Sequence, residues 1–540
     1  MVSPANRPPP ASALSLPYRI FRAFFRFLTS IWFREVNVVD DEFISDEAGA
    51  LFISWHPNGL IDPMLMTAKL PQRVTTLVSH RLFKLPLVSL PFRAAGVVPL
   101  TAAAMPFSRR TSSEISSDVL SAAATTLANG GSVLMFPEEK THAEASVQSI
   151  RSGAARLLLE AVRKAQEQGL PPPRLVPVGL HYSDSHRFRE RAAIVLERNM
   201  VFPNPPEEPD EGADKAWVND LTSAIGVELQ RANLAKSTWR ERMLIWKARS
   251  MVQAEKQRQS GEELRPLSYA ESVLGARRLR AGWEYLAVHD AAAAGELVQD
   301  CEAHFDELER RNLRPHDVDS RPEKLTFSGF FRILSSWLWS VAWMFGLVTW
   351  GAILGNYVPY KFQSLLEKIT RRANVDDSLQ GSIKVLSSVL VFPIWWLALT
   401  TTFVWLLLDP NSPVSVAMAS HEVLQYVTML PAVGAFVFFM LFWPLTARAH
   451  MKLYARFVRS TRRLRQWRSW QDVEHQWGQL SATQGRLAER LVALGAGLVL
   501  PGDPDWEDPP LGKDDAAVVR QRSTAEVAER SIGNFAQGFE

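Results

Sequence analysis

The sequence predicts an α/β domain, a mixed sheet flanked by helices, followed by a C-terminal α-helical membrane domain. Two observations lead to this prediction. Between residues 36 and 200, short apolar runs of strand length alternate with stretches of helical periodicity, which is typical of an α/β domain. After residue 330, long uncharged apolar stretches occur together with many of the 18 tryptophans, and both features are typical of a membrane region.

Composition limits the other possibilities. At 540 residues, the chain is long enough for two or three structural units. Lys and Arg total 60 and Asp and Glu 57, so the net charge of +3 indicates no particular class of partner. The single cysteine, Cys301, excludes an internal disulfide framework and a thiolate-only metal cluster. No pair of histidines has zinc-ligand spacing, so we expect no metal site.

The N-terminal part divides into two segments. Residues 1–16 are rich in Pro, Ala and Ser and lack the pattern of a secretory signal, so we expect a disordered leader. Residues 17–34 combine aromatic side chains with arginines and are too charged to span a bilayer. They predict an amphipathic helix that lies in the headgroup plane of a membrane, with a core helix of the soluble domain as the alternative.

Residues 35–205 form the predicted α/β domain. Its predicted helices run over Pro63 to Lys69, Ser113 to Ala128 and Ser152 to Gln168. Its predicted strands run over Ala50 to Trp55, Val74 to Ser79, Gly96 to Leu100, Ser132 to Phe136, Leu175 to Leu180 and Ala193 to Leu196.

A histidine follows the first predicted strand. The apolar run LFISW leads into His56, a Pro-Asn-Gly turn follows, and Asp62 precedes the next helix. If the chain folds back, Asp62 accepts a hydrogen bond from one imidazole nitrogen, and the other nitrogen is free to take a proton from a substrate hydroxyl. Taken alone, the pair is explained better by a strand-end histidine and a helix cap.

Two later motifs change that balance. The strand ending at Phe136 is followed by PEEKTH, which places Glu138, Lys140 and His142 in a loop, and IRSGAAR then opens a helix beside Arg151. Helix N-terminal amides with nearby cations suit an anion such as phosphate. The second motif, LVPVGLHY, predicts a buried strand in which Gly179 permits close approach of another backbone.

Together these motifs resemble those of the glycerophospholipid acyltransferase superfamily. The chain is most similar to the glycerol-3-phosphate/dihydroxyacetone-phosphate acyltransferase branch, which carries a C-terminal membrane region. The resemblance implies that His56 is the catalytic base, that Asp62 orients it, and that an acyl group passes from acyl-CoA or acyl-carrier protein (ACP) to a glycerol phosphate hydroxyl. No cofactor is implied, because the thioester is already activated. The candidate substrate-binding residues are Glu138, Lys140, Arg151, Arg109 and Asn58.

The chain departs from the family pattern in three places. The segment between His56 and Asp62 has one residue more than the common motif. The glycine usual after the FPE glutamate is Glu139, whose charge should weaken phosphate binding unless Lys140 pairs with it. The motif-two arginine is replaced by a Thr-Ala-Ala-Ala run, so that Arg109 or Arg110 would have to substitute. For His142, a solvated loop position is favoured over a position that lines the acceptor site.

The rest of the chain predicts helices. Residues 206–328 indicate a helical surface region after a Pro- and Glu-rich linker, and 385–446 predict a transmembrane hairpin. Residues 329–360 predict a re-entrant or membrane-spanning segment, with Gly346, Gly351, Gly355 and Pro359 as weak points. Residues 447–500 predict basic amphipathic helices, and the polar residues 501–540 predict a disordered tail.

Charge distribution predicts the topology. Both flanks of the hairpin are basic and its connecting loop has no Lys or Arg, so both ends should be cytoplasmic. We therefore expect a multi-pass membrane protein with a cytoplasmic catalytic domain, in a bacterial inner membrane or, in a eukaryote, the endoplasmic reticulum. The expected activity is glycerol-3-phosphate acylation to lysophosphatidic acid in phospholipid biosynthesis. The alternatives are a 1-acylglycerol-3-phosphate acyltransferase making phosphatidic acid and a degenerate, non-enzymatic lipid-binding relative.

Overall fold

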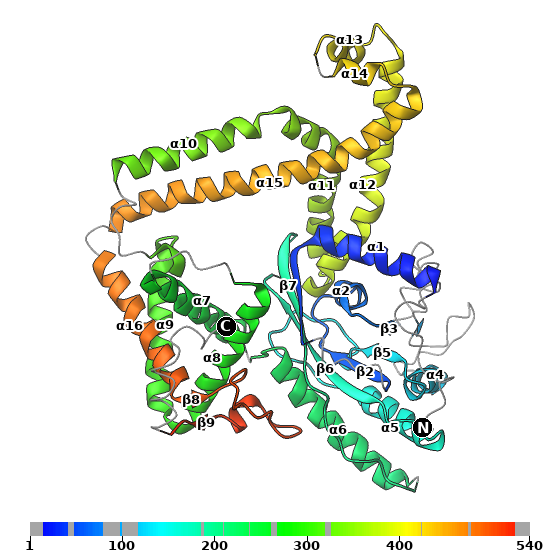
Figure 1. The fold of residues 1–540 in the computed structure, drawn as a ribbon, viewed down its shortest axis with the longest axis vertical. Helices are drawn as coiled ribbons and strands as arrows, with labels where there is room; N and C mark the ends of the chain where they lie inside the picture. The colour runs from blue at the N-terminus through cyan, green and yellow to red at the C-terminus, as the bar shows by residue number, and fades with distance from the viewer. Residues whose placement is uncertain are drawn as a thin grey trace. The chain divides into compact units, whose positions relative to one another are not determined.

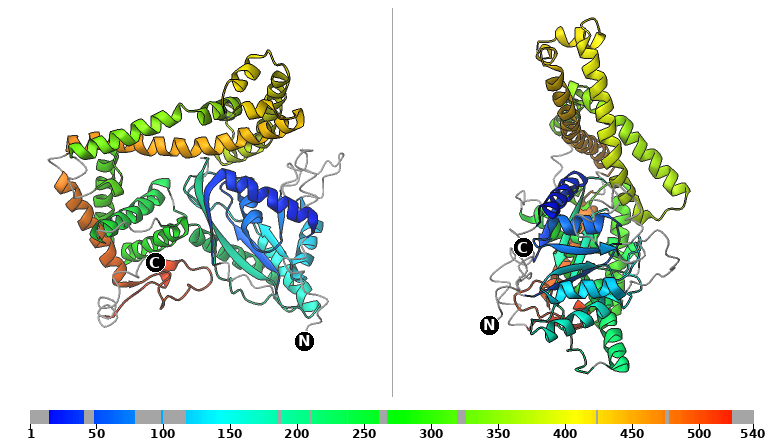
Figure 2. Two further views of the ribbon diagram at one scale, coloured as in Figure 1. Left: turned by 45° about the horizontal axis from the view of Figure 1, so that its top comes forward. Right: turned by 90° about the vertical axis from the view of Figure 1, so that its right-hand side faces the viewer.

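The computed structural model describes residues 15–40, 48–78, 98–99, 117–184, 188–208, 210–236, 238–260, 267–318, 326–422, 424–473 and 477–523. The chain forms two compact units, whose elements are labelled in Figure 1 and drawn from two further sides in Figure 2. Unit 1 comprises Met1–Ala303, Asp376–Ser382 and Arg486–Glu540. Unit 2 comprises His304–Val375 and Ile383–Gly485. Three separate stretches of chain therefore build unit 1.

A mixed seven-stranded sheet forms the centre of unit 1, in the order β1-β7-β6-β2-β5-β3-β4. Neighbouring strands are parallel except for β6 and β7, which are antiparallel. The strands are β1 (Phe33–Val39), β2 (Ala50–Ser54), β3 (Val74–Val78), β4 (Val98–Pro99), β5 (Ser132–Met135), β6 (Arg174–Tyr182) and β7 (Glu190–Leu196). Every predicted strand overlaps one of β2 to β7, which confirms the α/β prediction. Edge strand β1 was not predicted, because its half-buried residues do not form an apolar run.

Helices cover the sheet and continue after it. They are α1 (Leu16–Trp32), α2 (Ile61–Lys69), α4 (Ser117–Ala128), α5 (Gly153–Glu167), α6 (Glu211–Ala232), α7 (Trp239–Ser260), α8 (Tyr269–His289) and α9 (Ala291–Arg310). Gly179 of β6 lies against the end of α6, where a Cβ atom would come within 2.4 Å of the Ala232 carbonyl oxygen. The predicted close backbone approach at Gly179 is therefore confirmed.

Helix α1 has two different faces. One face is buried and includes Tyr18, Phe21, Phe25 and Trp32. On this face Arg22 donates hydrogen bonds to the carbonyl oxygens of Leu70 and Pro71, just after α2. This face fits the core-helix alternative. The opposite face exposes Leu16, Ile20, Phe24 and Phe27, so contact of α1 with a lipid surface stays a prediction that rests on this face alone.

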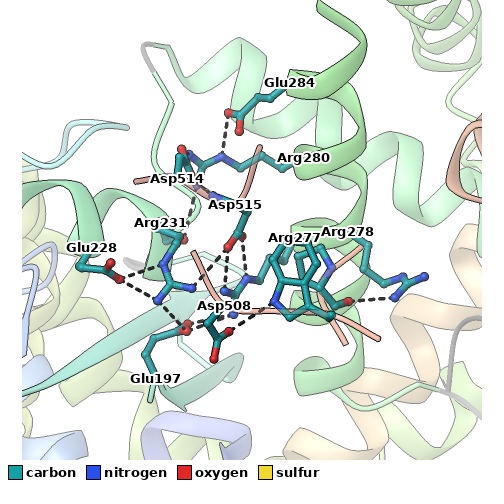
Figure 3. Close-up of polar contacts among 12 residues, drawn as sticks. Glu197, Glu228, Arg231, Arg277, Arg278, Arg280, Glu284, Asp508, Asp514 and Asp515 are labelled. Carbon is teal, nitrogen blue, oxygen red and sulfur yellow. Dashed lines mark hydrogen bonds and ion pairs between the residues drawn. The ribbon is translucent and has the colours of Figure 1, made fainter. Parts of the chain in front are cut away.

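Residues 501–523, which follow α16 (Trp477–Ala496), are folded, and this corrects the predicted disordered tail over these residues; residues 524–540 lie outside the described part of the chain. Strand β8 (Leu498–Val499) pairs with β9 (Arg520–Gln521). Between them Asp515, 2% exposed, contacts Arg277 of α8 at 2.8 Å and Arg231 of α6 at 3.3 Å. Figure 3 shows how these residues converge with Glu197 and Glu228. The polar composition of this segment indicated disorder. The arginines that neutralise its buried carboxylate lie far away in the sequence, so their contact with it could not be predicted.

Unit 2 contains long helices and two short ones. The long helices include α10 (Phe327–Met344), α11 (Leu347–Arg372), α12 (Asp377–Leu408, of which residues 377–382 belong to unit 1) and α15 (Ala432–Val473), and the short ones are α13 (Pro413–Ala419) and α14 (Gln425–Thr428). Among the described residues, two helices, Asp377–Leu408 and Ala432–Arg465, are long and apolar enough to cross a membrane, and a third span is possible if α10 and α11 act together.

Helices α10 and α11 meet at a bend of 63°. The break falls at Gly346, one of the predicted weak points, whereas the other three lie inside α11. Gly351 and Gly355 instead allow α11 to pack closely on α15. A Cβ atom at these two positions would come within 2.9 Å of Phe442 and 2.8 Å of Trp443, respectively. Whether 329–360 spans or re-enters the membrane stays a prediction.

Candidate active site

Three neighbouring parallel strands bring the predicted motifs to one edge of the sheet. His56 follows β2, Glu138 follows β5, and Tyr182 is the last residue of β6. Strand β2 pairs in parallel with both β5 and β6, so the carboxyl ends of all three strands lie side by side. Ligands of open α/β sheets bind at this edge. Sequence segments more than 40 residues apart therefore converge on His56.

The imidazole of His56 is hydrogen-bonded to Asp62. The two atoms in contact, Nδ1 of His56 and Oδ2 of Asp62, are 2.9 Å apart. Asp62 is fully buried in the first turn of α2, where the helix N-terminus favours a carboxylate. The His56 side chain is 18% exposed, and among the described residues no group bonds its Nε2. An imidazole held in this way presents a free nitrogen to a proton donor.

The additional residue between His56 and Asp62 is accommodated in a tight turn. Gly59 has φ +51°, a left-handed conformation that favours glycine. The Ile61 amide donates to the Asn58 carbonyl oxygen at 3.0 Å, and the Asn58 amide donates to Asp62 Oδ2 at 2.8 Å. This departure from the common motif therefore does not separate the histidine from the aspartate.

Tyr182 is a site residue that sequence reasoning missed. Its hydroxyl donates to Asp62 Oδ1 at 2.6 Å, so both carboxylate oxygens of Asp62 are engaged. Burial, together with the negative charge of Asp62, raises the pKa of Tyr182 well above its usual value. The phenol therefore stays protonated and serves as a permanent donor. The motif LVPVGLHY contains this residue, but only the strand pairing places it beside Asp62.

Glu138 connects the loop after β2 to the loop after β5. Its Oε2 accepts from the His56 amide at 2.8 Å, and its Oε1 contacts the Gln148 amide at 2.7 Å and His142 Nε2 at 2.8 Å. Both oxygens are thus used inside the protein, and this geometry favours positioning of the loops over direct contact with an acceptor. His142 is buried, which corrects the expectation of a solvated loop residue.

The predicted substrate-binding residues differ in how far they are exposed. Lys140 and Arg151 are exposed, and the Arg151 amide donates to the Pro137 carbonyl oxygen at 2.8 Å, which brings the start of α5 beside the FPE turn. Asn58 is fully buried and contributes its backbone to the turn after His56. Arg109 and Arg110 lie outside the described residues. Within the described residues, no cluster of three or more His, Cys, Asp or Glu is arranged to hold a metal ion.

Glu139 stands at the position where the motif resemblance predicts a glycine, and its backbone conformation is one that favours glycine. Its φ is +58°, a conformation that costs an L-residue about 1–2 kcal/mol. We expect Glu139→Gly to stabilise the protein by roughly 1 kcal/mol, measured as a rise in melting temperature of the purified chain. Glu139→Ala removes the same charge but keeps the strain, so it is the matched control. Equal stabilisation by both substitutions would show that loss of the negative charge, and not relief of backbone strain, stabilises the protein.

His181 gives the stability a pH dependence. It lies on the opposite face of β6 from Tyr182, and burial, followed by the charge of Arg242, lowers its pKa from 6.5 to about 3. The unfolded chain binds a proton near pH 6.5 and the folded chain does not. Below pH 6.5 the free energy of unfolding should therefore fall by up to about 1.4 kcal/mol per pH unit from this group.

Melting temperatures at pH 7.5 and 5.5 test this expectation. The drop between the two should be smaller in His181→Gln than in the unchanged protein. The exposed His289, substituted in the same way, is the control and should leave the drop unchanged. An identical drop in His181→Gln would show that another group titrates.

Comparison with known proteins agrees with this geometry. The Acyltransferase family model matches residues 35–181, which include His56, Asp62 and Glu138. No curated protein matches the chain. One solved structure, the 1-acyl-sn-glycerophosphate (LPA) acyltransferase PlsC from Thermotoga maritima, is 18% identical, covers 38% of this chain and 76% of that chain, and has a TM-score of 0.27. That similarity is too low to bear on function. Residues 35–181 are similar to the acyltransferase family, and the rest of the chain lies outside that match.

Proposed function

We propose that this chain is a membrane acyltransferase that transfers a fatty acyl group from acyl-CoA or acyl-ACP to glycerol 3-phosphate, making lysophosphatidic acid. The observation that carries the proposal is the contact of 2.9 Å between His56 and the buried Asp62, which leaves Nε2 free. The family match over the same residues supports the reaction class. The glycerol 3-phosphate acceptor rests on the resemblance of the motifs.

The reaction follows from this arrangement. Nε2 of His56 takes the proton of the acceptor hydroxyl as its oxygen attacks the thioester carbonyl. The tetrahedral intermediate then collapses, the C–S bond breaks, and the proton on His56 passes to the departing thiolate. Asp62 holds Nδ1–H and stabilises the imidazolium while it carries the charge. Lys140 and Arg151 are the proposed contacts for the acceptor phosphate.

Two alternatives use the same residues. A 1-acylglycerol-3-phosphate acyltransferase would acylate a lipid acceptor, and the exposed apolar face of α1 suits an acceptor that arrives from a bilayer. A non-enzymatic lipid-binding relative is disfavoured by the intact hydrogen bonds among His56, Asp62 and Tyr182. For either enzyme we propose that the catalytic domain is cytoplasmic, because the flanks of the hairpin are basic.

One assay tests all three. The purified full-length chain in liposomes is given labelled acyl-CoA or acyl-ACP with glycerol 3-phosphate or with 1-acylglycerol 3-phosphate, and the products are separated. Formation of lysophosphatidic acid supports the proposal. Phosphatidic acid formed only from the lipid acceptor supports the first alternative, and no transfer with any pair supports the non-enzymatic relative.

A further inference from the structure

The first two turns of α12 lie against the turn between His56 and Asp62. Residues Asp376–Ser382 belong to unit 1, although the same helix continues as an apolar span. The amide of Leu60 donates to Ser382 Oγ at 2.8 Å, and Ser382 Oγ donates to the Asn58 carbonyl oxygen at 3.3 Å. One hydroxyl therefore bridges two backbone groups of the turn between His56 and Asp62, across 322 positions of sequence between Leu60 and Ser382.

The fit between the two segments is close. A Cβ atom on Gly59 would lie 2.4 Å from Ser382 Oγ and 3.3 Å from Leu379 Cδ2. A side chain at this position would displace the Ser382 hydroxyl from its bonds to the turn or shift the helix. Gly59 thus serves two purposes, because its positive φ forms the turn and its missing side chain admits α12.

The two groups held by Ser382 are linked to the catalytic pair. Leu60 is the residue before α2, where backbone amides have no partner within the helix. Asn58 donates its own amide to the Asp62 oxygen that accepts from His56. A displacement of this turn would therefore move the carboxylate that orients the imidazole.

We propose that Ser382 is a positioning residue for catalysis, so that the N-terminal end of a membrane-spanning helix holds the His56–Asp62 turn in its active geometry. The inference rests on the proposed acyl transfer. It adds a residue outside the acyltransferase-family domain and assigns the membrane region a role beyond anchoring. Ser382 touches neither the imidazole nor the acceptor and acts through the backbone of the turn.

Steady-state kinetics of the full-length chain in liposomes test the proposal. In Ser382→Ala, kcat should fall roughly 10-fold while the KM values for donor and acceptor change less than about twofold. Ser382→Thr keeps the hydroxyl and should recover most of the loss. Ser387→Ala is the matched control, because its hydroxyl lies on the same helix but contacts Gln363, and its kcat should be unchanged. A kcat for Ser382→Ala equal to that of the unchanged protein would overturn the proposal.

A double-substitution cycle tests the contact itself. Gly59→Ala should reduce kcat strongly, because the new methyl group meets Ser382 Oγ. Adding Ser382→Ala removes that oxygen and should restore part of the activity, so the double variant should be faster than Gly59→Ala alone. If the fold-losses in kcat of the two single variants multiply in the double variant, Gly59 and Ser382 do not interact.

Hydrogen exchange separates failure of this inference from failure of the proposed function. The Leu60 amide should exchange faster in Ser382→Ala than in the unchanged protein, whatever reaction the protein catalyses. Faster exchange in a protein without transferase activity would support the contact between Leu60 and Ser382 and contradict the proposed function. Unchanged exchange and kcat in an active transferase would reject the role of Ser382 and keep the function.

Discussion

Replacing His56 with alanine should abolish measurable acyl transfer and leave the fold unchanged. A positioned base contributes about 10²–10⁴-fold to such a reaction, and no described residue can replace Nε2 at this place. The loss should appear in kcat at saturating donor and acceptor, measured with the acceptor that the liposome assay identifies. The melting temperature should change little, because the ring is partly exposed and its side chain forms one hydrogen bond.

His289→Ala is the matched control for this prediction. His289 is exposed at the end of α8 and contacts the Tyr285 carbonyl oxygen of its own helix. It should keep full activity. If His56→Ala kept more than about one tenth of the turnover, the loss would be smaller than the contribution of a catalytic base, and His56 would not be the base.

The second large effect concerns stability. Asp515→Ala should destabilise unit 1 by about 3 kcal/mol, the lower end of the cost of breaking a buried ion pair, because Arg231 and Arg277 both keep Glu197 as a partner. Arg277 and Arg231 would both lose a buried carboxylate (Figure 3). The shift would be measured as a lowered melting temperature. Asp505→Ala is the control, because that carboxylate is 33% exposed and its pairs should contribute about 1 kcal/mol or less.

The same carboxylate gives a direction for acid sensitivity. Burial alone would raise the pKa of Asp515, but the charge of Arg277, its hydrogen bond and the charge of Arg231 outweigh burial and lower the pKa below 3.8. The stability from Asp515 is therefore complete above pH 3.8 and is lost as the pH falls through the lowered value. If Asp515→Ala and Asp505→Ala melted at the same temperature at pH 7, the buried network would not stabilise the unit.

Local patterns were sufficient for much of the fold and for the proposed catalytic pair. Strands β2 and β5 are buried on both faces, so they stand out as apolar runs. His56 and Asp62 lie six residues apart, and a single turn joins them. For Glu138 the motif indicated a site carboxylate, but the three internal donors that occupy it were not predictable, because they depend on how two loops meet.

The remaining features depend on contacts between distant parts of the chain. Tyr182 reaches Asp62 across 120 positions, Arg277 reaches Asp515 across 238, and Leu60 reaches Ser382 across 322. Neither composition nor periodicity indicates which distant residue a side chain will meet. The polar residues of the tail indicate disorder when they are considered alone, and for that reason the fold of residues 501–523 was not predicted.

The discontinuous make-up of unit 1 has a consequence for biogenesis. The ribosome releases the sheet first, then the apolar helices, and only afterwards the segment that carries Asp515. The proposed support from Ser382 and the carboxylate beside Arg277 thus become available one after the other during synthesis. A nascent chain that still lacks residue 382 would hold a His56–Asp62 turn without that support, so the proposed active geometry would be complete only after the start of α12 has been made.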